Sequence, residues 1–119
     1  DALDLYHSMT VQVPIETRQG VHNVPISSII MVEAQGKKVI VHTTARDYES
    51  IHTMQYWLDQ LPVNRFFQTH RSFIINYEHI TNFDHMLVHL SNGQFTAYLT
   101  KRKYSAFKGA YLLYLESTR

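Results

Sequence analysis

The dipeptide Asn92-Gly93 constrains this 119-residue chain more than any other feature, because it joins two segments that both have the pattern of β-strands. Both residues accept the positive φ angles of a tight hairpin turn. In the predicted register three apolar pairs face each other on the core side: Leu90 with Phe95, Val88 with Ala97, and Met86 with Leu99. The residues that point the other way are Leu87, His89, Thr96 and Tyr98. Residues 86–99 therefore predict an antiparallel hairpin.

A second hairpin is predicted in the segment SIIMVEAQGKKVIVHTT, residues 28–44. We place its turn at Gln35-Gly36. The facing pairs are then Ala34 with Lys37, Glu33 with Lys38, Val32 with Val39, and Ile30 with Val41. This register puts the aliphatic side chains on one face and an opposite-charge pair on the other.

The N-terminal part predicts a further strand. Val11, Val13 and Ile15 alternate with polar residues, which is the period of a half-buried strand. Pro14 indicates an edge position, because proline donates no hydrogen bond to a ladder. Gly20 then predicts a turn into residues 21–24.

Two segments change to the period of an amphipathic helix. In residues 47–61 Asp47 or Ser50 is the expected cap and Pro62 the stop, and the apolar stripe consists of Ile51, Met54, Leu58 and Leu61. A C-terminal helix is expected over about residues 101–116, with Thr100 as its cap. Its stripe consists of Tyr104, Phe107, Tyr111 and Tyr114.

These elements predict a mainly β, antiparallel fold with one internal helix and one C-terminal helix. The chain, residues 1–119, has the length of one domain, and a composition of 45% hydrophobic and 18% charged residues is that of a globular protein. No pair of short helices has the pattern of a helix-turn-helix, and no alternation of strands and helices indicates a nucleotide-binding sheet.

The sequence offers little to a metal, a cofactor or a catalytic mechanism. It contains no cysteine, which excludes thiolate metal sites and fits a cytoplasmic location. His85 and His89 lie on a predicted strand, where such a spacing separates side chains by about 13 Å. No glycine-rich phosphate loop, nucleophile elbow, membrane-spanning run or signal peptide is recognisable. We therefore expect no enzyme, no metal site, no cofactor and no membrane partner.

Basic residues gather at the C-terminal end. Residues 101–119 contain five basic and one acidic residue, a net +4, whereas residues 1–100 contain six and nine, a net −3. If a helix begins at Lys101, then Lys101, Arg102 and Lys103 occupy its first turn, where the helix dipole disfavours cations. A bound anion such as phosphate explains this arrangement. The alternative is a helix that begins later, at Ser105.

The segment THRSFIIN, residues 69–76, joins a polar, basic tip to an apolar run. The tip contains His70, Arg71 and Ser72, and Asn76 can close a turn behind the run. The forked donors of Arg71 suit a guanine edge or a phosphate. A buried strand with a solvated tip is the alternative interpretation.

Three segments in this order resemble the LytTR family of DNA-binding domains. The most specific is RFFQTHRSFIINYEHI, residues 65–80, which resembles the family's central motif. Upstream, residues 29–44 resemble the hairpin before the family's internal helix. Downstream, residues 90–107 resemble its last hairpin and the basic segment that follows. The resemblance covers about residues 9–107.

The resemblance implies an elongated, antiparallel β-sheet fold of the LytTR type, which binds double-stranded DNA through loops inserted in successive major grooves. Transferred by motif position, the DNA-binding residues are Gln35, Lys37 and Lys38 in the first loop, His70, Arg71 and Ser72 in the central loop, and Thr100, Lys101, Arg102 and Lys103 in the third.

The family also implies a cellular role. It predicts the cytoplasmic output domain of a bacterial response regulator in a two-component, phosphorelay system, with an N-terminal receiver domain that this chain does not contain. Two copies are expected on paired direct repeats in promoters, in weak contact with each other. The alternative function is a β-rich protein-interaction or dimerisation module that binds no DNA.

Overall fold

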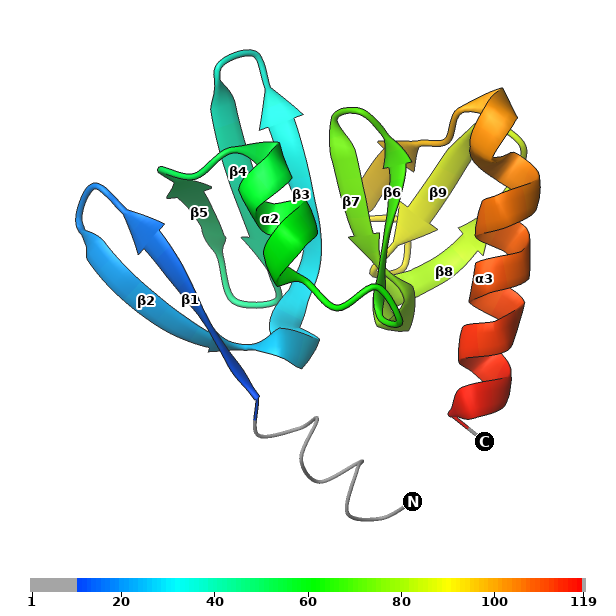
Figure 1. Ribbon diagram of the computed structural model, residues 1–119, viewed down its shortest axis with the longest axis horizontal. Helices are drawn as coiled ribbons and strands as arrows, with labels where there is room; N and C mark the ends of the chain where they lie inside the picture. The colour runs from blue at the N-terminus through cyan, green and yellow to red at the C-terminus, as the bar shows by residue number, and fades with distance from the viewer. Residues whose placement is uncertain (1–10, 119) are drawn as a thin grey trace.

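The computed structural model describes residues 11–118 and shows a broad, flat molecule with extents of 38 × 38 × 25 Å (Figure 1). In this part of the chain the strands form three antiparallel sheets, against which two α-helices pack: α2 (Met54–Gln60) and α3 (Tyr104–Ser117). The predicted fold class is confirmed: a mainly antiparallel β fold with one internal and one C-terminal helix.

The central sheet has the strand order β5-β4-β3-β7-β6. Its strands are β3 (Ile29–Gln35), β4 (Lys38–Thr43), β5 (Asp47–Ser50), β6 (Phe66–His70) and β7 (Phe73–Asn76). Every residue of β7 is buried, because both faces of the sheet are covered at this position. Successive residues of a strand point to opposite faces, so Ile74 and Ile75 enter different cores.

Two smaller sheets flank the central one. Strands β1 (Gln12–Thr17) and β2 (Gly20–Pro25) form the first, as the alternation around Ile15 predicts, and the short 3-10 helix η1 (Ile26–Ser28) connects it to β3. The second has the order β10-β9-β8, formed by β8 (Ile80–Phe83), β9 (Leu87–Leu90) and β10 (Phe95–Tyr98). The 3-10 helix η2 (Tyr77–His79) connects β7 to β8.

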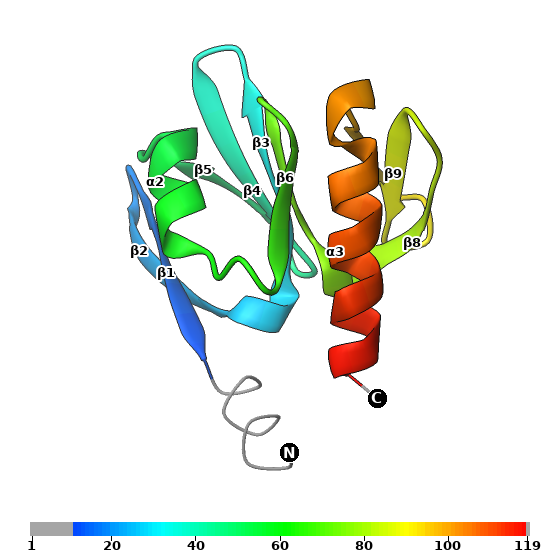
Figure 2. The same cartoon turned by 45° about the vertical axis from the view of Figure 1, so that its right-hand side comes forward.

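The central sheet separates two hydrophobic cores, and α2 and α3 lie on either side of β6 (Figure 2). Trp57 of α2 is fully buried in the first core, and Phe107 of α3 is fully buried in the second. An irregularity in β3 between Ile29 and Met31 changes the alternation, so that Ile29 enters the first core while Ile30 and Met31 enter the second.

The predicted register of the β3–β4 hairpin is wrong by one position at the turn. The turn residues are Gly36 and Lys37, and Gln35 faces Lys38. Gly36 has a φ of +62° and stands at the first central position of the turn, where a hairpin also accepts glycine. Val32 consequently faces Val41, and the predicted pair of Glu33 with Lys38 does not form.

The predicted helix over residues 47–61 is wrong in its first half. Residues 47–50 form β5, which pairs with β4, and the exposed fraction of Ile51 is 51%. The helix α2 begins only at Met54, where the Thr53 hydroxyl caps it by accepting a hydrogen bond from the backbone N–H of Tyr56 at 3.2 Å. The predicted apolar stripe therefore begins three residues before the helix, at Ile51, and pairing with β4 makes residues 47–50 a strand.

The predicted register of the Asn92-Gly93 hairpin is confirmed, since Leu90 faces Phe95 and Val88 faces Ala97. The turn is wider than two residues: Ser91, Asn92 and Gly93 all have positive φ angles, of 52°, 58° and 85°. One predicted core residue is wrong, because Met86 precedes β9 and is 72% exposed.

Candidate nucleic-acid interface

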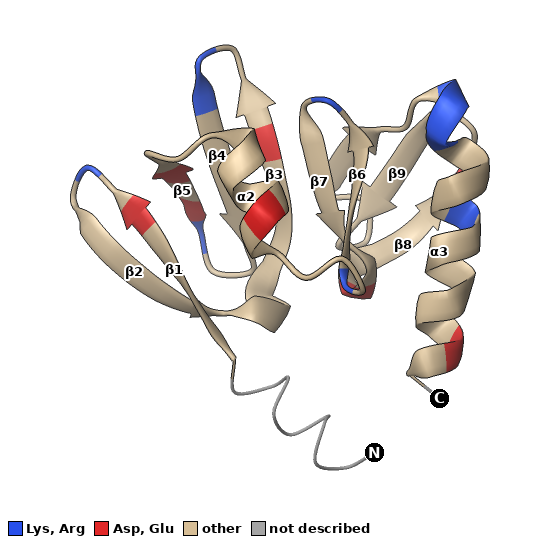
Figure 3. Ribbon diagram, in the orientation of Figure 1, with Lys and Arg blue, Asp and Glu red and all other residues tan. Residues whose placement is uncertain are grey.

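The three sequence-predicted loops lie along one edge of the molecule. Strands β3 and β7 are antiparallel neighbours, so the end of β3 lies beside the start of β7. The β3–β4 turn and the β6–β7 turn therefore project from the same end of the central sheet. A backbone hydrogen bond of 2.9 Å from the N–H of Ala34 to the carbonyl of Ser72 joins them. Lysine and arginine residues lie on all three loops (Figure 3), and we call the edge formed by residues 35–38, 70–72 and 100–103 the basic edge.

The central loop is held rigidly below an exposed arginine. The ring nitrogen Nδ1 of His70 accepts a hydrogen bond from the backbone N–H of Ser72 at 3.1 Å. The ring of His70 also lies 5.9 Å from the rings of both Phe73 and Tyr98. Arg71, between His70 and Ser72, is exposed. The loop can thus present a guanidinium from a backbone whose conformation is already fixed.

The third loop reaches the basic edge through the end of β10. The backbone N–H of Thr100 donates to the carbonyl of Thr69 at 3.1 Å, which ties this loop to the central one. Residues Lys101–Lys103 then form a 3-10 helix, η3, and α3 begins at Tyr104. The predicted start of the α-helix at Lys101 is therefore wrong by three residues, and Thr100 makes no side-chain capping bond.

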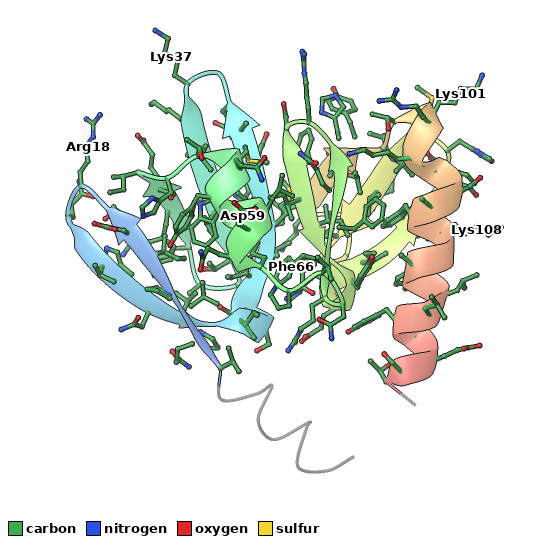
Figure 4. All side chains as sticks on the ribbon, in the orientation of Figure 1. Arg18, Lys37, Asp59, Phe66, Lys101 and Lys108 are labelled. Atoms are coloured by element: carbon green, nitrogen blue, oxygen red, sulfur yellow. The ribbon has the colours of Figure 1, made fainter. Side chains whose placement is uncertain are left out.

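Lys103 differs from its neighbours in orientation. Its ammonium Nζ donates a hydrogen bond of 2.9 Å to the backbone carbonyl of Gln68 in β6. Partial burial lowers the pKa of Lys103, and the nearby charge of Arg102 lowers it further. Lys101 and Arg102 are exposed instead. The structure thus gives Lys103 a contact within the chain, whereas Lys101 points away from the molecule (Figure 4).

The first loop is the most exposed of the three. Gln35, Lys37 and Lys38 are all exposed, and Lys37 points away from the tip of the β3–β4 hairpin (Figure 4). The Nζ atom of Lys38 lies 4.0 Å from a carboxylate oxygen of Glu49 in β5. Because both side chains are largely exposed, this ion pair contributes little, but it lowers the positive charge that Lys38 offers to a ligand.

All ten sequence-predicted residues therefore lie on the basic edge. A shallow pocket between the central and third loops is lined by Gln68, His70, Arg71, Thr100, Arg102 and Lys103. Sequence reasoning missed Gln68, whose carbonyl holds Lys103, and did not assign Tyr98 to the site. Tyr98 is 60% exposed beside His70, and its outward position in the predicted strand was a usable signal.

Within residues 11–118 no cluster of three or more histidine, aspartate or glutamate side chains could hold a metal ion. None of the described helices is long and apolar enough to span a membrane.

Comparisons with known proteins agree with this geometry. The family model of the LytTr DNA-binding domain matches residues 19–111. The chain is 29% identical to the sensory transduction protein LytR of Staphylococcus epidermidis over 85 residues, which cover 71% of this chain and 34% of that protein. It is 28% identical to the transcriptional regulatory protein NatR of Bacillus subtilis over 109 residues, 87% of this chain and 47% of that protein.

A solved structure has the same fold. It is the LytTr DNA-binding domain of a methyl-accepting/DNA response regulator from Bacillus cereus, which superposes with a TM-score of 0.71 at 28% sequence identity. The superposition covers 83% of this chain and 94% of that one. Against the curated relatives, by contrast, the chain spans less than half of their length.

Proposed function

The chain belongs to the LytTr DNA-binding domain family, and from this membership we propose that its basic edge binds double-stranded DNA sequence-specifically. The observation that carries the proposal is the convergence of three loops, from distant parts of the sequence, on one edge with exposed cations. Charge of this kind supplies affinity through phosphate neutralisation and counterion release.

The arrangement of the loops supports a loop-based mode of binding. Three loops on one edge can contact a duplex at separate points along one of its faces. The first and third loops are the outer pair, and the central loop lies between them.

In the proposed complex the loops contact different parts of the DNA. Arg71 reads a base edge in the major groove, because its exposed guanidinium, carried on a backbone held by His70, can form a bidentate pair with guanine. Lys37 and Lys101 hold phosphates, for which a flexible ammonium suffices. Arg102 can contact either a base edge or a phosphate. Lys103 fixes the third loop on β6 through the Gln68 carbonyl, which replaces the phosphate contact expected for it.

The cellular role follows the relatives. We infer that the chain is the output domain of a bacterial response regulator that works in the cytoplasm, with a receiver domain elsewhere in the full protein. Two copies then bind paired direct repeats in promoters. The domain carries out no catalytic step in this role and requires no cofactor.

The test is fluorescence anisotropy on a random duplex pool and on a duplex selected from it, each across a salt series. We expect Arg71→Ala to weaken binding to the selected duplex by about 1–3 kcal/mol and to change binding to the random pool much less. The matched control is Arg46→Ala. Arg46 follows β4 at the end opposite the basic edge and lies over the Tyr48 ring at 5.0 Å.

Two outcomes contradict the proposal. If the wild-type chain binds no duplex at low salt, the basic edge is not a DNA-binding surface, and the protein-interaction module becomes the better reading. If Arg46→Ala and Arg71→Ala weaken binding equally, the effect is one of net charge, and the assignment of base reading to Arg71 is wrong.

A further inference from the structure

The outer face of α3, defined here as Lys108, Gly109, Leu112 and Glu116, takes no part in either core. The opposite side of the helix packs into the second core with Phe107, Tyr111 and Tyr114. Leu112 is 51% exposed, and the flanking Leu113 and Leu115 are 69% and 39% exposed. Lys108 points away from the body of the molecule (Figure 4). Of these three leucines only Leu112 belongs to the outer face, whereas Leu113 and Leu115 are two residues apart and project from its two flanks.

A glycine lies in the middle of this face. Gly109 stands in the interior of α3, where glycine is the least favourable residue apart from proline. A Cβ atom at this position would meet nothing within 4 Å, so among the described residues no neighbour requires its absence. Glycine at an exposed helical position does allow another backbone to approach closely.

The charges of the face are arranged symmetrically. Lys108, Leu112 and Glu116 are four residues apart, so they form one row along the helix. Leu112 lies at the centre of the row, with a cation toward the N-terminal end and an anion toward the C-terminal end. A row of this kind is complementary to itself when a second copy lies antiparallel.

We propose that α3 pairs with α3 of a second copy of this chain, antiparallel and about a two-fold axis near Leu112. Each Lys108 then faces the partner's Glu116, the two Leu112 side chains meet at the axis, and each Gly109 faces Leu115 of the partner subunit. A two-fold interface uses the same patch on both copies, which this row satisfies. Parallel pairing would instead place lysine against lysine and glutamate against glutamate.

The pairing of the two helices is weak because the interface is small. The 14 residues of α3 extend over about 21 Å, and one face of such a helix offers much less than the roughly 800 Å² per partner of a stable complex. The interface therefore forms when copies are concentrated or held together by something else.

The geometry has a consequence that rests on the proposed function. The N-terminal end of α3 lies at the basic edge and its C-terminal end lies at the opposite side of the molecule (Figure 1). Antiparallel pairing therefore turns the two basic edges in opposite directions. Such a dimer holds two separate DNA segments, which differs from two copies side by side on one pair of direct repeats.

The experiment is sedimentation equilibrium of the wild-type chain from about 10 µM to about 1 mM, together with charge-swapped variants. We expect Lys108→Glu and Glu116→Lys each to raise the dissociation constant of the dimer roughly three- to tenfold, because each creates two repelling pairs. The double variant Lys108→Glu/Glu116→Lys should restore the wild-type value, since the row is reversed but still self-complementary. The uncharged variant Leu112→Gln should weaken self-association as well.

The outcomes separate this proposal from that of DNA binding. A wild-type chain that stays monomeric at the highest concentration would overturn it, and so would self-association that the double swap does not restore. Leu112→Gln should bind a single DNA site as the wild-type chain does, because Leu112 lies outside the three loops. If DNA binding fails while the charge swaps behave as expected, the α3 interface stands and only its consequence for two DNA segments falls.

Discussion

The number of exposed cations on the basic edge predicts how steeply DNA affinity falls with salt. Five cations of this edge are exposed, and the four that count here are Lys37, Arg71, Lys101 and Arg102. Lys38 is left out because the Glu49 carboxylate, 4.0 Å away, offsets its charge. Each neutralised phosphate contributes about −0.9 to the slope of log affinity against log salt. The slope should therefore be about −3.6, or about −2.7 if Arg71 contacts a base. A fourfold rise in salt then lowers the affinity roughly 40- to 150-fold.

The perturbation is the double variant Lys101→Ala/Arg102→Ala, which removes two of these charges. The slope should become shallower by about 1.8, because two fewer counterion releases accompany binding. The assay is fluorescence anisotropy on one random duplex at several salt concentrations. The matched control, Arg46→Ala/Lys108→Ala, removes the same charge from positions away from the three loops. Equal changes of slope in the two double variants would refute the reasoning, since only net charge would then matter.

Three further predictions concern stability, each measured by urea unfolding. Thr53→Ala should lower the free energy of unfolding by about 1 kcal/mol, because it removes the cap on the N–H of Tyr56, and an unchanged value would show that α2 needs no cap. Asn76→Ala should lower the free energy of unfolding by about 2–3 kcal/mol, because the buried amide donates to the Ile29 carbonyl at 2.8 Å. Asn76→Asp, which keeps the shape of the side chain but removes this donor, is the matched comparison. Burial raises the pKa of Tyr77 to about 12, so stability should be full below pH 10, the ordinary pKa, and fall as pH rises from there through 12. Tyr77→Phe should make that fall smaller, with the remainder expected from Tyr114, whose pKa burial also raises; an unchanged fall in the variant would assign it to other groups.

Elements whose chemistry is local could be predicted from the sequence. The Asn92-Gly93 hairpin has its predicted register because the alternation on both sides leaves one pairing that buries the apolar set. The β3–β4 turn was ambiguous by the same rules, because Gly36 can occupy either central position of a hairpin turn. The opposite charges of Glu33 and Lys38 favoured the wrong choice.

In the structure Glu33 contacts a histidine of β4 in place of Lys38, and that histidine in turn contacts β5. Glu33 lies 2.8 Å from His42, whose other ring nitrogen lies 2.7 Å from Asp47 of β5. Residues 47–50 contain none of the predicted apolar stripe, and their pairing with β4 makes them a strand. Propensity and period are weak priors that tertiary pairing overrides, so this part of the fold could not be predicted from local patterns.

In the candidate site, too, the sequence predicts which residues are present but not how their side chains are oriented. The sequence indicates which residues are basic, but the orientation of Lys103 depends on η3 meeting β6, which the bond from Thr100 to Thr69 secures. This difference is measurable. If all six cations of the predicted site neutralised phosphates, the salt slope would be about −5.4. Without Lys103, whose ammonium donates to the Gln68 carbonyl, and Lys38, which lies beside a carboxylate, the slope is about −3.6, or about −2.7 if Arg71 contacts a base. One salt titration of the wild-type chain therefore distinguishes a charge count from the folded arrangement.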